Sequence, residues 1–172
     1  MTIYKQAAEI NALYDKVFSL PPMRGMDSQE ARIEMTGIAF QESAFKHRRQ
    51  LPRNPGGPYG PANGLWQFER GGGVKGVLNH PSTKAKALAL CNHFGVTPLP
   101  ANVWTMLAEN DVLAAAFARL LLYTDAAPLP KVGDQDGAWD YYIRNWRPGK
   151  PHLKTWADCY GKALKAHKDR NA

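Results

Sequence analysis

The segment from residue 28 to residue 43 limits the possible folds most strongly, because its apolar residues lie on more than one side of a helix. These residues are Ala31, Ile33, Met35, Ile38, Ala39 and Phe40. A surface helix shows one apolar stripe, whereas a helix that is apolar around its circumference is buried by its neighbours. Asp27-Ser28 provides an N-cap, and Glu30 in the first turn is favoured by the helix dipole. We therefore expect a central, buried helix surrounded by others.

Most of the remaining chain also repeats apolar residues at helical spacing. Residues 3–19 do so until Pro21-Pro22. Further helices are expected over residues 81–93, from about 101, and over 110–123, 137–146 and 152–168. At most a small β element is expected, near residues 59–70. The length of 172 residues suits one core, and no repeat or linker is visible. We expect a mainly α fold with a single domain over residues 1–172.

The helical pattern stops between Lys46 and Asn63. Four basic residues, Lys46, Arg48, Arg49 and Arg53, come before a Pro- and Gly-rich run over residues 54–61. A loop of about eighteen residues is longer than compact domains usually contain without a functional reason. A short apolar piece over residues 64–69 follows, as a strand or one helical turn, and Gly71-Gly72-Gly73 is expected to stop it.

The net charge of +7 favours an anionic partner, and nucleic acid and the bacterial wall both qualify. A basic chain can also be basic without a specific partner. Cys91 and Cys159 have no neighbouring Cys or His at metal-ligand spacing. We expect two buried free thiols, no metal site and no cofactor.

No membrane segment is expected. The longest apolar stretch, residues 112–123, is short and contains Arg119. The N-terminus lacks the basic start, apolar run and cleavage site of a secretory signal. We expect synthesis in the cytoplasm of the producing cell, with no contact to a membrane.

Glu42 has the sequence environment of a catalytic acid. Cleaving a glycosidic bond needs an acid that protonates the leaving oxygen. Glu42 lies near the end of the most hydrophobic helix, where burial and the negative end of the helix dipole both disfavour its carboxylate. Both effects raise the pKa, and we expect desolvation to be the larger. The competing interpretation is a Glu that simply faces solvent at a helix end.

Two short motifs resemble those of lytic transglycosylases and goose-type lysozymes, which belong to the lysozyme-like superfamily. The first motif is Gln41-Glu42-Ser43-Ala44-Phe45, and the second is Gly64-Leu65-Trp66-Gln67-Phe68. The resemblance implies a lysozyme-like fold in which Glu42 is the catalytic acid. It also implies that the second motif lines the substrate cleft, with substrate contacts from Ser43, Gly64, Trp66 and Gln67. The length and the absence of a leader resemble phage-encoded members of the superfamily.

Such families usually carry a further Tyr-Asn element, for which the best candidates are Tyr142 and Asn145. We take one of these two as a substrate contact, although both could instead serve plain packing. Glu69, just beyond the second motif, is the candidate for a second catalytic carboxyl that activates water. Glu30 and Glu34 are expected to form a solvated or capping face of the Glu42 helix.

The resemblance therefore implies a phage lysozyme, endolysin or virion-associated lysin that cleaves between N-acetylmuramic acid and N-acetylglucosamine. Its partners would be peptidoglycan glycan strands, it would act as a monomer, and it would work in the periplasm or cell wall. A lytic transglycosylase that forms a 1,6-anhydro product is an equally compatible enzyme. Two functions without catalysis also stay open. One is a nucleic-acid-binding module, although no sequence motif supports it, and the other is a virion structural protein.

Overall fold

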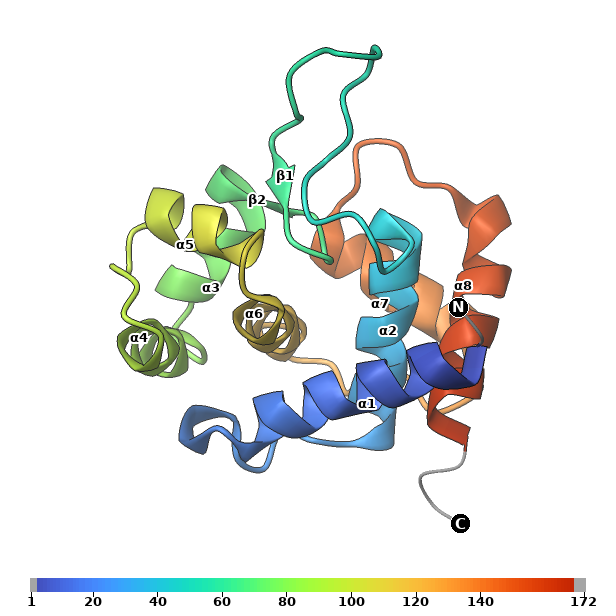
Figure 1. The fold of residues 1–172 in the computed structure, drawn as a ribbon. Helices are drawn as coiled ribbons and strands as arrows, with labels where there is room; N and C mark the ends of the chain where they lie inside the picture. Colours follow the sequence, from blue (N-terminus) through green and yellow to red (C-terminus); the bar gives the residue numbers. More distant parts are fainter. Residues whose placement is uncertain (1–2, 169–172) are drawn as a thin grey trace.

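The structure is a computed structural model that describes residues 3–168, with side chains described from residue 6 onward. It is mainly helical with a small β element, which confirms the expected fold class (Figure 1). The α-helices of the described residues are α1 (Ile3–Ser19), α2 (Gln29–Ser43), α3 (Lys75–Asn79), α4 (Lys84–His93), α5 (Pro100–Leu107), α6 (Asp111–Tyr123), α7 (Gln135–Trp146) and α8 (Leu153–His167). The other elements are β1 (Ala62–Asn63), β2 (Phe68–Glu69), a 3-10 turn over Pro21–Met23 and a π-helical turn over Arg70–Val74.

Helix α2 is the buried centre of the fold, as its sequence indicated. Every residue from 31 to 39 is buried, and α1, α6, α7 and α8 surround the helix in Figure 1. The helix begins at Ser28, whose Oγ accepts a hydrogen bond from the backbone N–H of Ala31 at 3.1 Å. It ends at Ala44, which has left-handed backbone geometry with φ of 55°.

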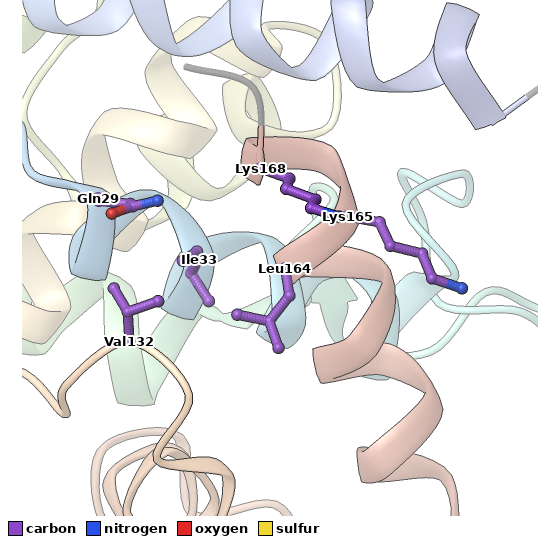
Figure 2. A pocket seen from close by; sticks show the side chains of 6 residues that line it. All are labelled: Gln29, Ile33, Val132, Leu164, Lys165 and Lys168. Atoms are coloured by element: carbon purple, nitrogen blue, oxygen red, sulfur yellow. The ribbon is translucent and has the colours of Figure 1, made fainter. Parts of the chain in front are cut away.

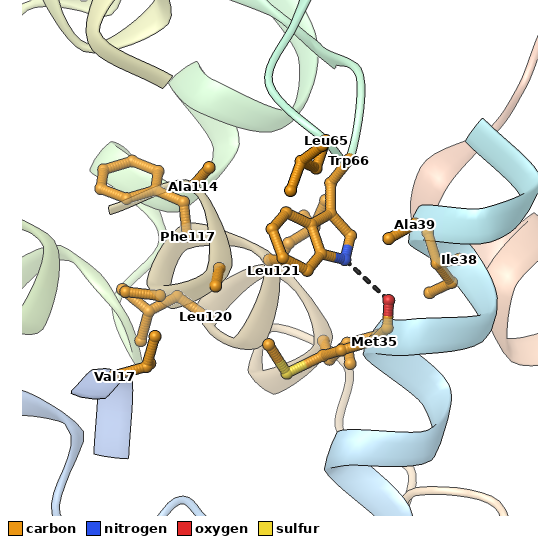
Figure 3. Close-up of a cluster of buried hydrophobic side chains, with 14 of the residues drawn as sticks. Val17, Met35, Ile38, Ala39, Leu65, Trp66, Ala114, Phe117, Leu120 and Leu121 are labelled. Atoms are coloured by element: carbon orange, nitrogen blue, oxygen red, sulfur yellow. Dashed lines mark hydrogen bonds between the residues drawn. The ribbon is translucent and has the colours of Figure 1, made fainter. Parts of the chain in front are cut away.

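Trp66 fills the space between α2 and α6 (Figure 3). Its side chain is fully buried, and its indole N–H donates to the backbone carbonyl of Met35 at 2.8 Å. The α6 side chains opposite it come from a helix that is buried from Leu113 to Leu122 and capped by Asn110. Removing a large buried aromatic side chain typically costs about 3–5 kcal/mol. Trp66 therefore fixes the second motif against the central helix.

The β element orders the segment that follows the long loop. Strands β1 and β2 pair in antiparallel fashion, with Ala62 opposite Glu69 and Asn63 opposite Phe68. Arg49 forms a further bridge to Asn63. Residues 64–67 form the connecting turn, so the piece over residues 64–69 combines a turn with a strand.

The structure tests three further expectations from the sequence. The short apolar piece ends at Glu69, just before Gly71-Gly72-Gly73, as expected, and the three glycines lie in the π-helical turn that leads directly into α3. The expectation that Glu34 faces solvent is wrong. Its side chain is only 2% exposed, and burial raises its pKa well above the ordinary value. Cys91 and Cys159 are buried and free, as expected.

Within the described residues, the longest apolar helical stretches fall short of what crossing a membrane requires.

Candidate active site

Glu42 occupies the last turn of α2, and Tyr142 of α7 holds its carboxyl group. The Tyr142 hydroxyl donates a hydrogen bond to Glu42 Oε1 at 2.5 Å. Tyr142 is itself fixed by Trp156 of α8, whose ring stacks on it at a centroid distance of 5.3 Å and an interplanar angle of 4°. Glu42 remains partly accessible, whereas Tyr142 and Trp156 are buried. The site therefore joins three helices around the carboxyl group of one partly accessible residue.

Burial raises the pKa of Glu42 to about 7. The nearby charge of Glu69 raises it further, while the hydrogen bond from Tyr142 opposes the shift by stabilising the carboxylate. A carboxyl group with a pKa near neutrality can donate a proton and take it back at the same pH. The chemistry available at this position is therefore general acid and base catalysis.

The two sequence motifs lie side by side in the structure. The Ser43 hydroxyl donates to the backbone carbonyl of Leu65 at 2.7 Å and to that of Ala39 at 3.1 Å. The indole N–H of Trp146 in α7 donates to the backbone carbonyl of Trp66 at 2.9 Å. Hydrogen bonds from α2 and α7 thus hold the second motif next to Glu42.

Gln67 connects the second motif to the start of the long loop. Its side-chain Nε2 donates to the backbone carbonyl of Gly64 at 2.9 Å and to that of His47 at 3.3 Å. The backbone of Gln67 is left-handed, with φ of 49°. The side chain is half-buried, so part of Gln67 remains at the surface near His47.

Strained backbone gathers around this site. The non-glycine residues of the described chain with positive φ are Ala44, Phe45, Gln67 and Arg147. Ala44 and Phe45 directly follow the Glu42 helix, Gln67 belongs to the second motif, and Arg147 ends the helix that carries Tyr142. Left-handed geometry costs a non-glycine residue roughly 1–2 kcal/mol. Such strain is typically retained at functional sites.

Three residues expected to contact substrate serve the packing instead. Trp66 is fully buried and Ser43 is 6% exposed, so neither side chain can reach a sugar. Gly64 is also buried, and its φ of 79° together with the nearby Leu107 carbonyl leaves no room for a side chain. These expectations are wrong because the motif residues hold the second motif in place from beneath.

Of the two candidates on α7, the structure brings Tyr142 and not Asn145 to Glu42. Asn145 Nδ2 donates to Asp125 Oδ2 at 2.9 Å and to the Tyr141 carbonyl at 2.8 Å, so it belongs to a different cluster. Trp156, which stacks on Tyr142, was not recognised from the sequence. No local pattern could have indicated it, because the contact depends on how α8 packs on α7.

Glu69 lies on β2 and is exposed to solvent. It is close enough for its charge to raise the pKa of Glu42. A second, solvent-exposed carboxyl group on a separate element therefore acts electrostatically on Glu42.

Two further observations concern metal ligands and a hollow elsewhere on the surface. Among the described residues, no group of three or more His, Cys, Asp or Glu side chains is placed to hold a metal ion. A hollow in the surface lies at the opposite end of α2 from Glu42, and Figure 2 shows its lining residues, which are Gln29, Ile33, Val132, Leu164, Lys165 and Lys168. Glu42 is thirteen positions after Gln29 on the helix, so the helical rise between these two residues is about 20 Å.

Comparisons with protein-family models, with curated proteins and with solved structures find no match to this chain.

Proposed function

We propose that the protein is a peptidoglycan-cleaving glycosidase of the lysozyme-like class, with Glu42 as its general acid. The observation that carries the proposal concerns the carboxyl group of Glu42. Partial burial raises its pKa to about 7, and the residue still remains partly accessible to solvent. The adjoining second motif and the strained backbone around it support the same assignment. The bond to be cleaved joins C1 of N-acetylmuramic acid to O4 of N-acetylglucosamine.

In the first step, protonated Glu42 donates its proton to the leaving O4 as the bond from C1 to O4 breaks. The positive charge that develops on the muramic acid ring is stabilised by the carboxylate that Glu42 has become. Tyr142 keeps its hydrogen bond to this carboxylate and fixes its orientation. In a lytic transglycosylase Glu42 then accepts the proton of the attacking hydroxyl, which restores the starting state. In an inverting hydrolase the second carboxyl group would accept the proton of the attacking water, and Glu42 would regain its proton from solvent.

The attacking group distinguishes two reactions. In a hydrolase, a water molecule attacks C1 and the product is a reducing sugar. In a lytic transglycosylase, the 6-hydroxyl of the same muramic acid attacks, and the product is a 1,6-anhydro sugar lighter by one water. Glu69 is the candidate for the second carboxyl group that an inverting hydrolase needs, and its charge acts on Glu42, whereas a transglycosylase can work with Glu42 alone.

The proposed biological setting is lysis of a bacterial wall by a phage-encoded enzyme, either free or carried in the virion. The protein would be made in the host cytoplasm and act on glycan strands in the periplasm or cell wall. The net charge of +7 supports encounter with an anionic wall.

Mass spectrometry of the products released from purified sacculi tests the proposal. We expect Glu42→Gln to lower the rate of product release by at least about 100-fold, which is the usual contribution of a general acid. Glu109→Gln, at an exposed site after α5, is the matched control and should leave the rate unchanged. Glu69→Gln should slow the reaction only if the product is the hydrolysed one. A Glu42→Gln protein with native circular dichroism and undiminished release would refute the proposal.

A further inference from the structure

The long loop after α2 carries cationic charge that the rest of the described chain does not neutralise. We call residues 46–61 the basic loop; it contains Lys46, Arg48, Arg49 and Arg53 and no acidic residue. Arg48 is paired with Asp111, with its Nε 2.7 Å from Oδ1. The other three side chains are exposed, and none forms an ion pair with a described residue. Three cations are therefore free to meet an anionic partner.

The basic loop is held in one arrangement by backbone hydrogen bonds. The N–H of Gln50 donates to the Ala62 carbonyl at 3.0 Å, and the N–H of Gly60 donates to the Gln50 carbonyl at 3.0 Å. The N–H of Gly64 donates to the Arg48 carbonyl at 2.8 Å. These bonds extend the hairpin of β1 and β2, and the basic loop projects from the body of the molecule beyond β1 (Figure 1). Arg49 lies between these bonded residues and is thus presented from a defined backbone.

An exposed aromatic ring accompanies these charges. Tyr59 is 61% exposed, and the guanidinium carbon of Arg49 lies 5.9 Å from the centre of its ring. An exposed Tyr beside a cation offers both an apolar face and a positive charge. That combination suits a partner with carboxylates and aliphatic side chains.

The basic loop also adjoins the candidate catalytic carboxyl group. It begins four residues after Glu42, and its far end leads into β1, the strand paired with the strand of Glu69. Gln67 binds the backbone carbonyl of His47 within it. A polymer held at Glu42 would therefore extend past the basic loop.

We propose that the basic loop binds the carboxylates of the peptide stems of peptidoglycan. This inference rests on the proposed function. The two amino sugars of the glycan carry no free carboxylate once the muramic acid is joined to its peptide, so cations beside the cleavage site have no partner on the glycan itself. The peptide stems do carry free carboxylates, and they leave the glycan at every muramic acid. The charge of the basic loop matches the peptide rather than the sugar.

Binding to sacculi tests this inference. The protein carries Glu42→Gln so that binding is measured without digestion, and the sacculi are free of teichoic acid. One sample keeps its peptide stems. The other is stripped of them by an amidase, and the lactyl carboxylates that this frees on the muramic acid are then converted to neutral amides, so that the stripped strands carry no carboxylate. We expect Arg49→Gln/Arg53→Gln to lower the affinity for intact sacculi about five- to tenfold at low ionic strength, with little effect on stripped strands. The matched control is Lys16→Gln/Lys84→Gln, which removes the same charge from α1 and α4.

The outcomes separate the inference from the proposed function. Equal binding to intact and stripped sacculi, or equal losses in the two double variants, would overturn the role of the basic loop even if the wild type cleaves the wall. Tighter binding to duplex DNA than to intact sacculi, lost in Arg49→Gln/Arg53→Gln, would overturn it in favour of a nucleic-acid surface. With Glu42 intact, Arg49→Gln/Arg53→Gln should still cleave stripped strands at the wild-type rate. If the wild type cleaves neither sample, the proposed function fails, and the binding preference is judged separately.

Discussion

Each residue of the site gains its chemistry from what surrounds it rather than from its type. Glu42 is one of many carboxylates in the chain, but it combines partial access with a pKa raised by burial to about 7. Glu34, eight residues earlier on the same helix, is also buried, yet it is only 2% exposed and cannot meet a substrate. Accessibility is therefore what makes Glu42, and not Glu34, the candidate acid.

The hydrogen bond between Tyr142 and Glu42 predicts a shift in the pH dependence of activity. A general acid must be protonated, so activity should fall as pH rises through the pKa of Glu42, near 7. The Tyr142 hydroxyl stabilises the carboxylate and lowers this pKa. In Tyr142→Phe we therefore expect the alkaline limb of the profile of product release against pH to move to higher pH. A limb that stays in place, or that moves to lower pH, would contradict this role.

At this scale the sequence indicated the residues of the candidate site better than it indicated which of them are buried. Glu42 and Gln67 could be found because the two motifs that contain them are local in sequence. The roles of Ser43 and Trp66 could not, because whether a side chain points to substrate or into the core depends on the position of α6 and α7. The pairing of Tyr142 with Glu42 joins residues 100 positions apart, and only the packed helices reveal it.

The helices are joined by a buried polar chain as well as by apolar packing. Thr36 of α2 lies between Tyr14 of α1 and His167 of α8, with its Oγ1 2.9 Å from the Tyr14 hydroxyl and 2.9 Å from His167 Nε2. All three side chains are buried. Burial lowers the pKa of His167 to about 4, so its ring is neutral at physiological pH. The hydrogen-bonded side chains of Tyr14, Thr36 and His167 thus connect three helices, and none of the three carries a charge.

Removing the middle of this chain should destabilise the protein without changing its chemistry. Thr36→Val leaves the Tyr14 hydroxyl and the His167 ring each short of a partner, which typically costs about 1–3 kcal/mol. Urea denaturation measures the loss of unfolding free energy. The matched control is Thr105→Val, whose hydroxyl is exposed and whose loss should cost less than about 0.5 kcal/mol. An equal effect of the two substitutions would show that the buried chain contributes nothing.

Helix boundaries were largely predictable, whereas the segment after the second motif was not. Ser28 and Asn110 identified the starts of α2 and α6 because capping is a local interaction. The run Gly71-Gly72-Gly73 was expected to end the short apolar piece, and β2 does end at Glu69, but no sequence signal indicated the π-helical turn that contains the three glycines. Close packing requires a glycine at position 73, because a side chain there would collide with the Phe68 ring.

At the scale of the whole molecule, both ends of the chain contribute to one core. The buried apolar side chains form a connected cluster that includes residues from α1, α2, α6 and α8. Asn11 of α1 donates a hydrogen bond to the Ala166 carbonyl of α8 at 2.8 Å, which ties the N-terminal helix to the C-terminal one. The sequence predicted the mainly α class and the central helix, but the closure of α1 onto α8 has no local signal.

A shared core predicts a single cooperative unfolding transition. The five tryptophans are distributed over the second motif, α5, α7 and α8, so their fluorescence reports on separate parts of the fold. We expect thermal melts followed by tryptophan fluorescence and by far-ultraviolet circular dichroism to have the same midpoint. Two separated transitions would show that the chain contains more than one folding unit.

The protonation of Glu42 tests the central claim most directly. Nuclear magnetic resonance of carboxyl-labelled protein, with Glu42→Gln to assign the signal, gives the pH at which this side chain loses its proton. We predict a midpoint near pH 7 that coincides with the alkaline limb of peptidoglycan cleavage. A midpoint near 4.5, the ordinary value for Glu, would contradict the account, because Glu42 would then carry no proton to donate at neutral pH.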